Sequence, residues 1–226
     1  GLAGEGSECL GYDDALSRDH DFGAGFCIWI PDDLPEETVQ QLRNAYAALP
    51  KSYYGITRTE MPEAEGRVGV CRQSAFFRRL LGAPGVPETE SEWLAVQDGM
   101  LAAACSGAVF RDDAGTFSAV RRRLALGYPE EVRLRLLAQA LGRMAQCGQY
   151  NYTRMRRRDD IPTAQLYLAE FCKAAMQAKH LLCGSYAPYE KWLLRSTGEL
   201  PGGAALAQEL KQLLCLSPAE DGSRYI

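Results

Sequence analysis

Residues 6–21, GSECLGYDDALSRDHD, combine a small-residue turn with a pair of acids. The turn is Gly6-Ser7, and the acids are Asp19 and Asp21, with one residue between them. If the end of the stretch is extended, both carboxylates point to the same face, because side chains alternate along a strand. Adjacent carboxylates repel each other unless a cation lies between them, and Mg²⁺ is a cation that prefers oxygen ligands. A Gly-Ser turn that opens a helix would offer N–H groups and a hydroxyl to an anion, so the stretch predicts a site for a triphosphate and its metal.

The composition of the whole chain is that of a globular protein. Its 226 residues, 46% of them hydrophobic and 24% charged, are enough for one large domain or two small ones. The net charge of -4 disfavours nucleic acid as a partner, because non-specific binding needs a basic surface. No signal peptide or membrane-length apolar run is visible, so we expect a cytoplasmic protein with no membrane partner. Because the chain begins without an initiator Met, we also expect a piece of a longer protein, truncated ahead of residue 6.

The cysteines do not form a metal-binding or disulfide pattern. There are eight cysteines, none in a CxxC pair, and only two histidines. Zinc sites normally need closely spaced Cys and His ligands. We therefore predict reduced thiols, several of them buried.

Hydrophobic spacing divides the chain into a mixed first part and a helical second part. The apolar run 26–30 predicts a central strand buried on both faces, and 67–71 predicts a second strand. Helical spacing or start signals appear at 35–49, 74–81, 91–105, 118–125, 129–158, 162–183, 188–196 and 204–216. The change to long helices places a domain boundary near residue 105. We predict an α+β fold, with an α/β domain over residues 1–105 and a helical domain over 106–226.

The opening stretch resembles the signature of the DNA polymerase beta-like nucleotidyltransferase superfamily. That signature is a Gly-Ser turn, a spacer of about ten residues and an acid-x-acid pair, here Asp19-His20-Asp21. The whole sequence of this stretch, together with the motifs GQYNY at 148–152 and YAPYEKW at 186–192, resembles the uncharacterised bacterial family DUF4037. That family is placed among those nucleotidyltransferases.

The resemblance implies a fold and an activity. The fold would be a small mixed sheet in a nucleotidyltransferase-like domain, followed by an α-helical bundle. Asp19 and Asp21 would be catalytic ligands of Mg²⁺, and Gly6 and Ser7 would hold the phosphates of ATP or another nucleoside triphosphate. The enzyme would transfer AMP to a hydroxyl of a small molecule or protein, with the nucleotide bound between the two domains.

The third acid of that family pattern has no clear position in this chain. The strand that should carry it reads Val68-Gly69-Val70. Other acids lie at Glu63, Glu65, Asp112 and Asp113, and no spacing favours one of them. A catalytically weak or inactive module that binds nucleotide is therefore the alternative hypothesis.

Polar residues in the helical part offer further candidate contacts. Tyr150, Asn151 and Arg154 interrupt an apolar helix and could contact the nucleotide or the acceptor; the alternative is hydrogen bonding between helices. Lys191 could approach a triphosphate as a point charge.

The arginine clusters 121–123 and 156–158 sit at helix ends, where cations meet the dipole favourably by about 0.3–1 kcal/mol each. The alternative is contact with phosphate or RNA, which gives a third hypothesis, an RNA-directed transferase.

Overall fold

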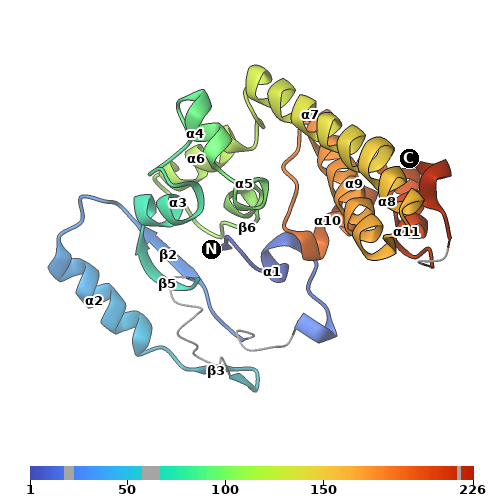
Figure 1. Cartoon of the computed structure of the whole chain (residues 1–226). Coiled ribbons are helices and arrows are strands. Elements are labelled where there is room, and N and C mark those ends of the chain that lie inside the picture. Colours follow the sequence, from blue (N-terminus) through green and yellow to red (C-terminus); the bar gives the residue numbers. More distant parts are fainter. Residues whose placement is uncertain (18–22, 58–66, 218–219) are drawn as a thin grey trace. The chain divides into compact units, whose positions relative to one another are not determined.

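The computed structural model describes residues 1–17, 23–57, 67–217 and 220–226. They form two compact units, Gly1–Leu126 and Gly127–Ile226, called here the first and second unit (Figure 1). The boundary at residue 105 stays a prediction about domains. Helix α6 (Thr116–Leu124), which lies beyond that residue, belongs to the first compact unit.

The strands of the first unit are short and pair two by two in the described part of the chain. The pairs are β1 (Leu2–Ala3) antiparallel with β6 (Gly107–Ala108), β2 (Cys27–Ile30) parallel with β5 (Gly69–Arg72), and β3 (Ser52–Tyr53) antiparallel with β4 (Ile56–Thr57). Cys27 and Ile30 of β2 are buried, whereas the two residues between them are partly exposed. Cys27 and Ile30 point to opposite faces, so each face of β2 has one buried residue, but in the described part of the chain β2 pairs with β5 alone and is not the predicted central strand.

The helices of the first unit follow the predicted ranges with one exception. They are α1 (Ser7–Leu10), the 3-10 turn η1 (Ala15–Ser17), α2 (Glu36–Ala47), α3 (Gln73–Leu81), α4 (Glu90–Ala95), α5 (Asp98–Cys105) and α6. The single helix predicted over 91–105 is wrong, because Val96 and Gln97 are extended and separate α4 from α5. Helix α4 begins at a capping box, in which the Thr89 hydroxyl accepts from the Glu92 N–H and the Glu92 carboxylate accepts from the Thr89 N–H.

An aromatic cluster joins β2 to α3 and α6 in the core of the first unit. Trp29 stacks on Phe117 of α6, with ring centroids 3.8 Å apart and ring planes 11° apart. Phe76 and Phe77 of α3 lie 5.2 and 5.1 Å from the Phe117 ring. Such aromatic pairs contribute about 0.5–1.5 kcal/mol each beyond the burial of their area. Phe117 therefore makes α6 part of this core.

The second unit is a helical bundle, as predicted. Its elements are α7 (Glu130–Met144), a π-helix labelled η3 (Ala145–Tyr152), α8 (Thr153–Arg157), α9 (Ile161–Leu182), α10 (Glu190–Glu199), α11 (Gly203–Leu214) and the 3-10 turn η4 (Gly222–Tyr225). The predicted helix over 129–158 is continuous, but its middle winds as a π-helix. Helices α7 and α9 pack side by side in Figure 1.

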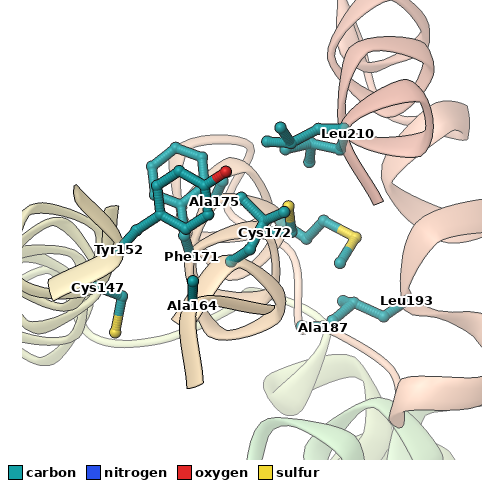
Figure 2. Packing of buried hydrophobic residues seen from close by; sticks show 12 residues of the cluster. Cys147, Tyr152, Ala164, Phe171, Cys172, Ala175, Ala187, Leu193 and Leu210 are labelled. Carbon is teal, nitrogen blue, oxygen red and sulfur yellow. The ribbon is translucent and has the colours of Figure 1, made fainter. Parts of the chain in front are cut away.

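The core of the second unit gathers around α9. Figure 2 shows the buried cluster, in which Tyr152 of the π-helix lies with Phe171 and Cys172 of α9, Leu193 of α10 and Leu210 of α11. His180 of α9 is also buried, and its Nδ1 lies 3.0 Å from the Ser185 hydroxyl. Burial lowers the pKa of His180 to about 4, so the side chain is neutral at neutral pH.

These features agree with the sequence at the level of fold class. The mixture of small sheets and helices is α+β. The eight cysteines, all within the described ranges, are thiols rather than disulfides, and burial raises the pKa of Cys9 and Cys172 to about 12. No helix in the described ranges is both long and apolar enough to cross a membrane.

Candidate functional site

The Gly6-Ser7 pair forms a turn that opens a helix, as the sequence predicts. Gly6 has φ 130°, a conformation that favours glycine, and α1 begins at Ser7. Ser7 is buried, and its carbonyl accepts from the Tyr12 N–H at 2.8 Å. The helix ends after one turn at Gly11, which is left-handed. A glycine in an unusual conformation therefore lies at each end of this one-turn helix.

A cation from a distant part of the chain lies against this turn. Arg67 Nη2 donates to the Glu5 carbonyl at 3.0 Å and to Glu8 Oε1 at 3.1 Å. A Cβ atom at Gly6 would lie 2.5 Å from Arg67 Nη2 and 2.5 Å from the Glu8 carboxylate oxygens, so these two side-chain ends would have to shift, and the φ of 130° adds strain for any other residue. Sequence reasoning missed Arg67, because it lies sixty residues away and no local pattern marks it.

The acids that flank the turn are both paired with arginines. Glu8 pairs with Arg67, and the Glu5 carboxylate pairs with Arg79 Nη1 at 2.5 Å. These side chains are partly exposed, so each pair contributes little to stability, at most about 1 kcal/mol. Their effect on a ligand is different: the two arginines offset the negative charge that would otherwise repel an anion from the turn.

The predicted metal ligands Asp19 and Asp21 lie outside the described residues, as do Glu63 and Glu65. Strand β5 carries no acid, and its Gly69 has φ 101°, so the backbone there requires glycine. The remaining candidates for the third acid are engaged elsewhere. Asp112 accepts from the N–H groups of Gly115 and Ser118 at 2.9 and 2.8 Å, and Asp113 pairs with Arg111.

The Asp112 side chain is a carboxylate that accepts hydrogen bonds from N–H groups at the start of α6. Partial burial would raise its pKa, but the hydrogen bonds from Ser118 and Gly115 outweigh that effect and lower the pKa below its usual value. Within the described ranges, no group of three or more His, Cys, Asp and Glu side chains could hold a metal ion. Asp112 therefore acts as a helix cap in this structure.

The candidate nucleotide contacts in the second unit lie on its surface. The Arg154 guanidinium lies over the Tyr150 ring, 4.7 Å from its centroid, and also donates to the Tyr150 hydroxyl. Asn151, beside Tyr150, is half-buried. Lys191 is exposed on α10, with its Nζ 5.1 Å from the Trp192 ring centroid. Tyr150 and Arg154 are paired with each other on an exposed face, rather than buried between helices.

The first arginine cluster has a structural role. Arg121 of α6 donates to four successive carbonyls at the end of α5, those of Ala104, Cys105, Ser106 and Gly107, at 2.5–3.2 Å. Ala104, Cys105 and Ser106 lie in the last turn and C-cap of α5, where carbonyls lack intrahelical partners, and Gly107 begins β6. Arg122 and Arg123 are exposed on the same helix.

We expect Arg121→Ala to lower the free energy of unfolding by about 1–3 kcal/mol, because it leaves several carbonyls without their donor. The matched control is Arg123→Ala, an exposed position on the same helix, for which a change within about 0.5 kcal/mol is expected. Urea denaturation of the purified chain measures both. Equal effects of the two substitutions would contradict the capping role of Arg121.

Comparison with known proteins yields one family match. Residues 93–193 match the model of a family described as "Domain of unknown function (DUF4037)". No curated protein and no solved structure matches the chain. The matched segment runs from Trp93 in α4 to Leu193 in α10 and does not include the Gly6–Asp21 stretch. The match supports the DUF4037 resemblance: over residues 93–193, this chain is similar to that family.

Proposed function

We propose that the chain is a Mg²⁺-dependent nucleotidyltransferase that transfers AMP from ATP to a hydroxyl of a small molecule or protein. The observation that carries the proposal is the Gly6-Ser7 turn with Arg67 against it. A tight turn with a buried serine and a neighbouring guanidinium suits a phosphate group, because N–H groups, hydroxyls and arginines all donate hydrogen bonds to phosphate oxygens.

The donor set is appropriate for Mg²⁺. Asp19 and Asp21 supply two carboxylates, and Mg²⁺ commonly takes one or two carboxylates together with substrate phosphates. When bound, the ion would stabilise charge on the transferring phosphate. Ser7 and the turn would hold the phosphate chain, and Arg67, which also pairs with Glu8, would donate a hydrogen bond to it. The acceptor oxygen forms a bond to the α-phosphorus while the bond to pyrophosphate breaks.

The remaining proposed nucleotide contacts come from the second unit: Lys191, Tyr150, Asn151 and Arg154. Their chemistry supports the assignment, since an ammonium or guanidinium can pair with phosphate and a tyrosine ring can stack on a base. The acceptor is proposed only as a hydroxyl compound.

A catalytically weak module that binds nucleotide is the second candidate function. It is favoured by the composition of β5, which reads Gly-Val-Cys-Arg and carries no acid. Asp112 and Asp113 are engaged in a helix cap and an ion pair. A protein with only two of the three acids would bind Mg²⁺ and nucleotide but would lack a group to activate the acceptor.

Titration with each nucleoside triphosphate, with and without Mg²⁺, tests the proposal. We expect the wild-type chain to bind ATP in the presence of Mg²⁺, and Asp19→Ala/Asp21→Ala to weaken that binding at least about tenfold, a loss of about 1.4 kcal/mol. Pyrophosphate release on incubation with candidate acceptors then separates the enzyme from the module that only binds.

The matched control is Asp33→Ala/Glu37→Ala, which removes two exposed acids from the start of the α2 region of the same unit. If the Asp19/Asp21 variant binds Mg-ATP as tightly as this control does, the metal site is wrongly assigned. Arg67→Ala is expected to weaken ATP binding and Arg67→Lys to restore part of it, because lysine retains the charge but not the two-pronged geometry.

A further inference from the structure

Three exposed side chains share one face of the continuous helix formed by η3 and α8, and a fourth, Arg158, is the C-cap residue that follows it. Arg154, Arg157 and Arg158 are spaced i, i+3 and i+4, and Tyr150 lies four residues before Arg154, so helical geometry aligns them. All four are exposed, and 52% of the Tyr150 surface is accessible. Tyr152 points the other way, into the buried cluster of Figure 2. These four residues are called here the Tyr150–Arg158 face.

The packing beneath this face holds it in place. A Cβ atom at Gly148 would lie 2.4 Å from Ile226 Cγ2 and 2.7 Å from Phe171 Cδ2, so the π-helix approaches its neighbours closely. Tyr152 is fully buried, and its hydroxyl accepts from the Gly222 N–H at 2.8 Å. π-helical turns are rare and are found frequently at functional sites. Here the π-helix carries Tyr150 on a closely packed base.

Two acids, Asp159 and Asp160, directly follow this face in the sequence. In the described ranges, no ion pair joins Arg154, Arg157 or Arg158 to these or other carboxylates. Asp160 instead caps α9, accepting from the Thr163 N–H. The helix dipole favours cations in the last turn but does not explain an exposed tyrosine paired with an arginine one turn earlier.

The two units carry net charges of opposite sign. Residues 127–226 contain 13 Lys and Arg against 10 Asp and Glu, a net +3, whereas residues 1–126 contain 12 against 19, a net -7. The net charge of -4 disfavoured a nucleic-acid partner for the chain as a whole. The same argument does not hold for the second unit, because an electrostatic footprint depends on the local face.

We propose that the Tyr150–Arg158 face binds single-stranded nucleic acid. Arg154, Arg157 and Arg158 contact successive phosphates, and a base stacks on the exposed part of the Tyr150 ring, which the Arg154 guanidinium contacts from one side. From residue 150 to 158 the face extends about 12 Å at a rise of about 1.5 Å per residue, which is longer than a single phosphate group.

A polynucleotide fits this face better than a free nucleotide does. Small ligands need concave sites that enclose most of their surface, whereas strands bind on open surfaces through several phosphate and stacking contacts. Binding of a strand does not require Asp19 or Asp21, although it shares Tyr150 and Arg154 with the proposed nucleotide contacts. Because Tyr150 and Arg154 are also proposed ATP contacts, ATP is included as a competitor in the test.

Fluorescence anisotropy with labelled 12-nucleotide single strands of RNA and DNA tests the proposal on the full chain. We expect binding that weakens with added salt, and Arg154→Ala/Arg157→Ala/Arg158→Ala to weaken it at least tenfold and to reduce the slope of log K against log salt by about 2, since each phosphate contact contributes about 0.7 for a single strand. Tyr150→Ala should weaken binding at least fivefold at an unchanged slope, whereas Tyr150→Phe, which keeps the ring, should retain most of it.

The matched control is Arg135→Ala/Arg195→Ala/Lys211→Ala, which removes three exposed cations from α7, α10 and α11 of the same unit. An equal loss with this control would overturn the proposal, because binding would then follow net charge alone. Full displacement of the strand by ATP at equal concentration would overturn it in favour of a mononucleotide site. Tight binding to vesicles of anionic lipid, with no binding to either strand, would overturn it in favour of a membrane surface. Hydrogen exchange of the α9 amides verifies that each variant is folded.

Discussion

Replacing Tyr152 by alanine is expected to lower the free energy of unfolding of the second unit by about 3–5 kcal/mol, the usual range for truncating a large buried aromatic side chain. Tyr152 has no exposed surface and lies in the cluster around α9. Its truncation would leave a cavity and would also remove the acceptor of the Gly222 N–H. Urea denaturation, followed through hydrogen exchange of the α9 amides, measures this loss in the second unit.

Tyr152→Phe separates the two contributions. The ring remains, but the hydroxyl that accepts from Gly222 and donates to the Asp221 carboxylate is removed. We expect a smaller loss of about 1–3 kcal/mol, because a buried N–H group is left without a partner. If the phenylalanine variant is as stable as the wild-type chain, the hydrogen bond does not hold the C-terminal turn η4 to the π-helix.

Replacing Gly203 by alanine is the other substitution with a large expected effect. A Cβ atom there would lie 1.9 Å from the Thr197 carbonyl oxygen and 3.3 Å from Leu200 Cβ. The first of these atoms is backbone of α10 and cannot move away as a flexible side chain would. We expect a loss of about 3 kcal/mol, at the upper end of the range for overpacking, because α10 and α11 must separate. The same urea and exchange measurement applies.

Gly142→Ala is the matched control for Gly203→Ala. Gly142 lies inside α7, and a Cβ atom there would meet nothing within 4 Å among the described residues. Alanine is favoured over glycine in a helix interior by about 0.5–1 kcal/mol, so this variant should be more stable than the wild-type chain. If Gly142→Ala and Gly203→Ala destabilise equally, the clash at Thr197 is not the cause.

The helices of the second unit were predictable to within a few residues because their signals are local. Helix α9 was predicted over 162–183 and runs over Ile161–Leu182, with Asp160 as its cap and Pro162 in its first turn. The start of α4 was also encoded locally, in the capping box of Thr89 and Glu92. The break at Val96 was missed, since the apolar residues on both sides continue a helical pattern.

The candidate site was predictable only in part. The Gly6-Ser7 turn follows from the residue types, because glycine tolerates the required φ and serine opens a helix. Asp19 and Asp21 rest on spacing and family resemblance and stay predictions. Arg67 could not be predicted at this turn, because its partners lie about sixty residues away and no periodicity connects them.

By itself the sequence determined the fold class, the Gly-Ser turn and most helix boundaries, since these depend on side-chain periodicity and on caps within a few residues. Only the tertiary structure decided what each arginine does. Arg121 meets the end of α5 and Arg67 meets the turn at Gly6, whereas Arg154, Arg157 and Arg158 remain on an open face. The reason is that a guanidinium has the same hydrogen-bonding capacity at every position, and only the folded chain sets which carbonyls and carboxylates come within about 3 Å of it.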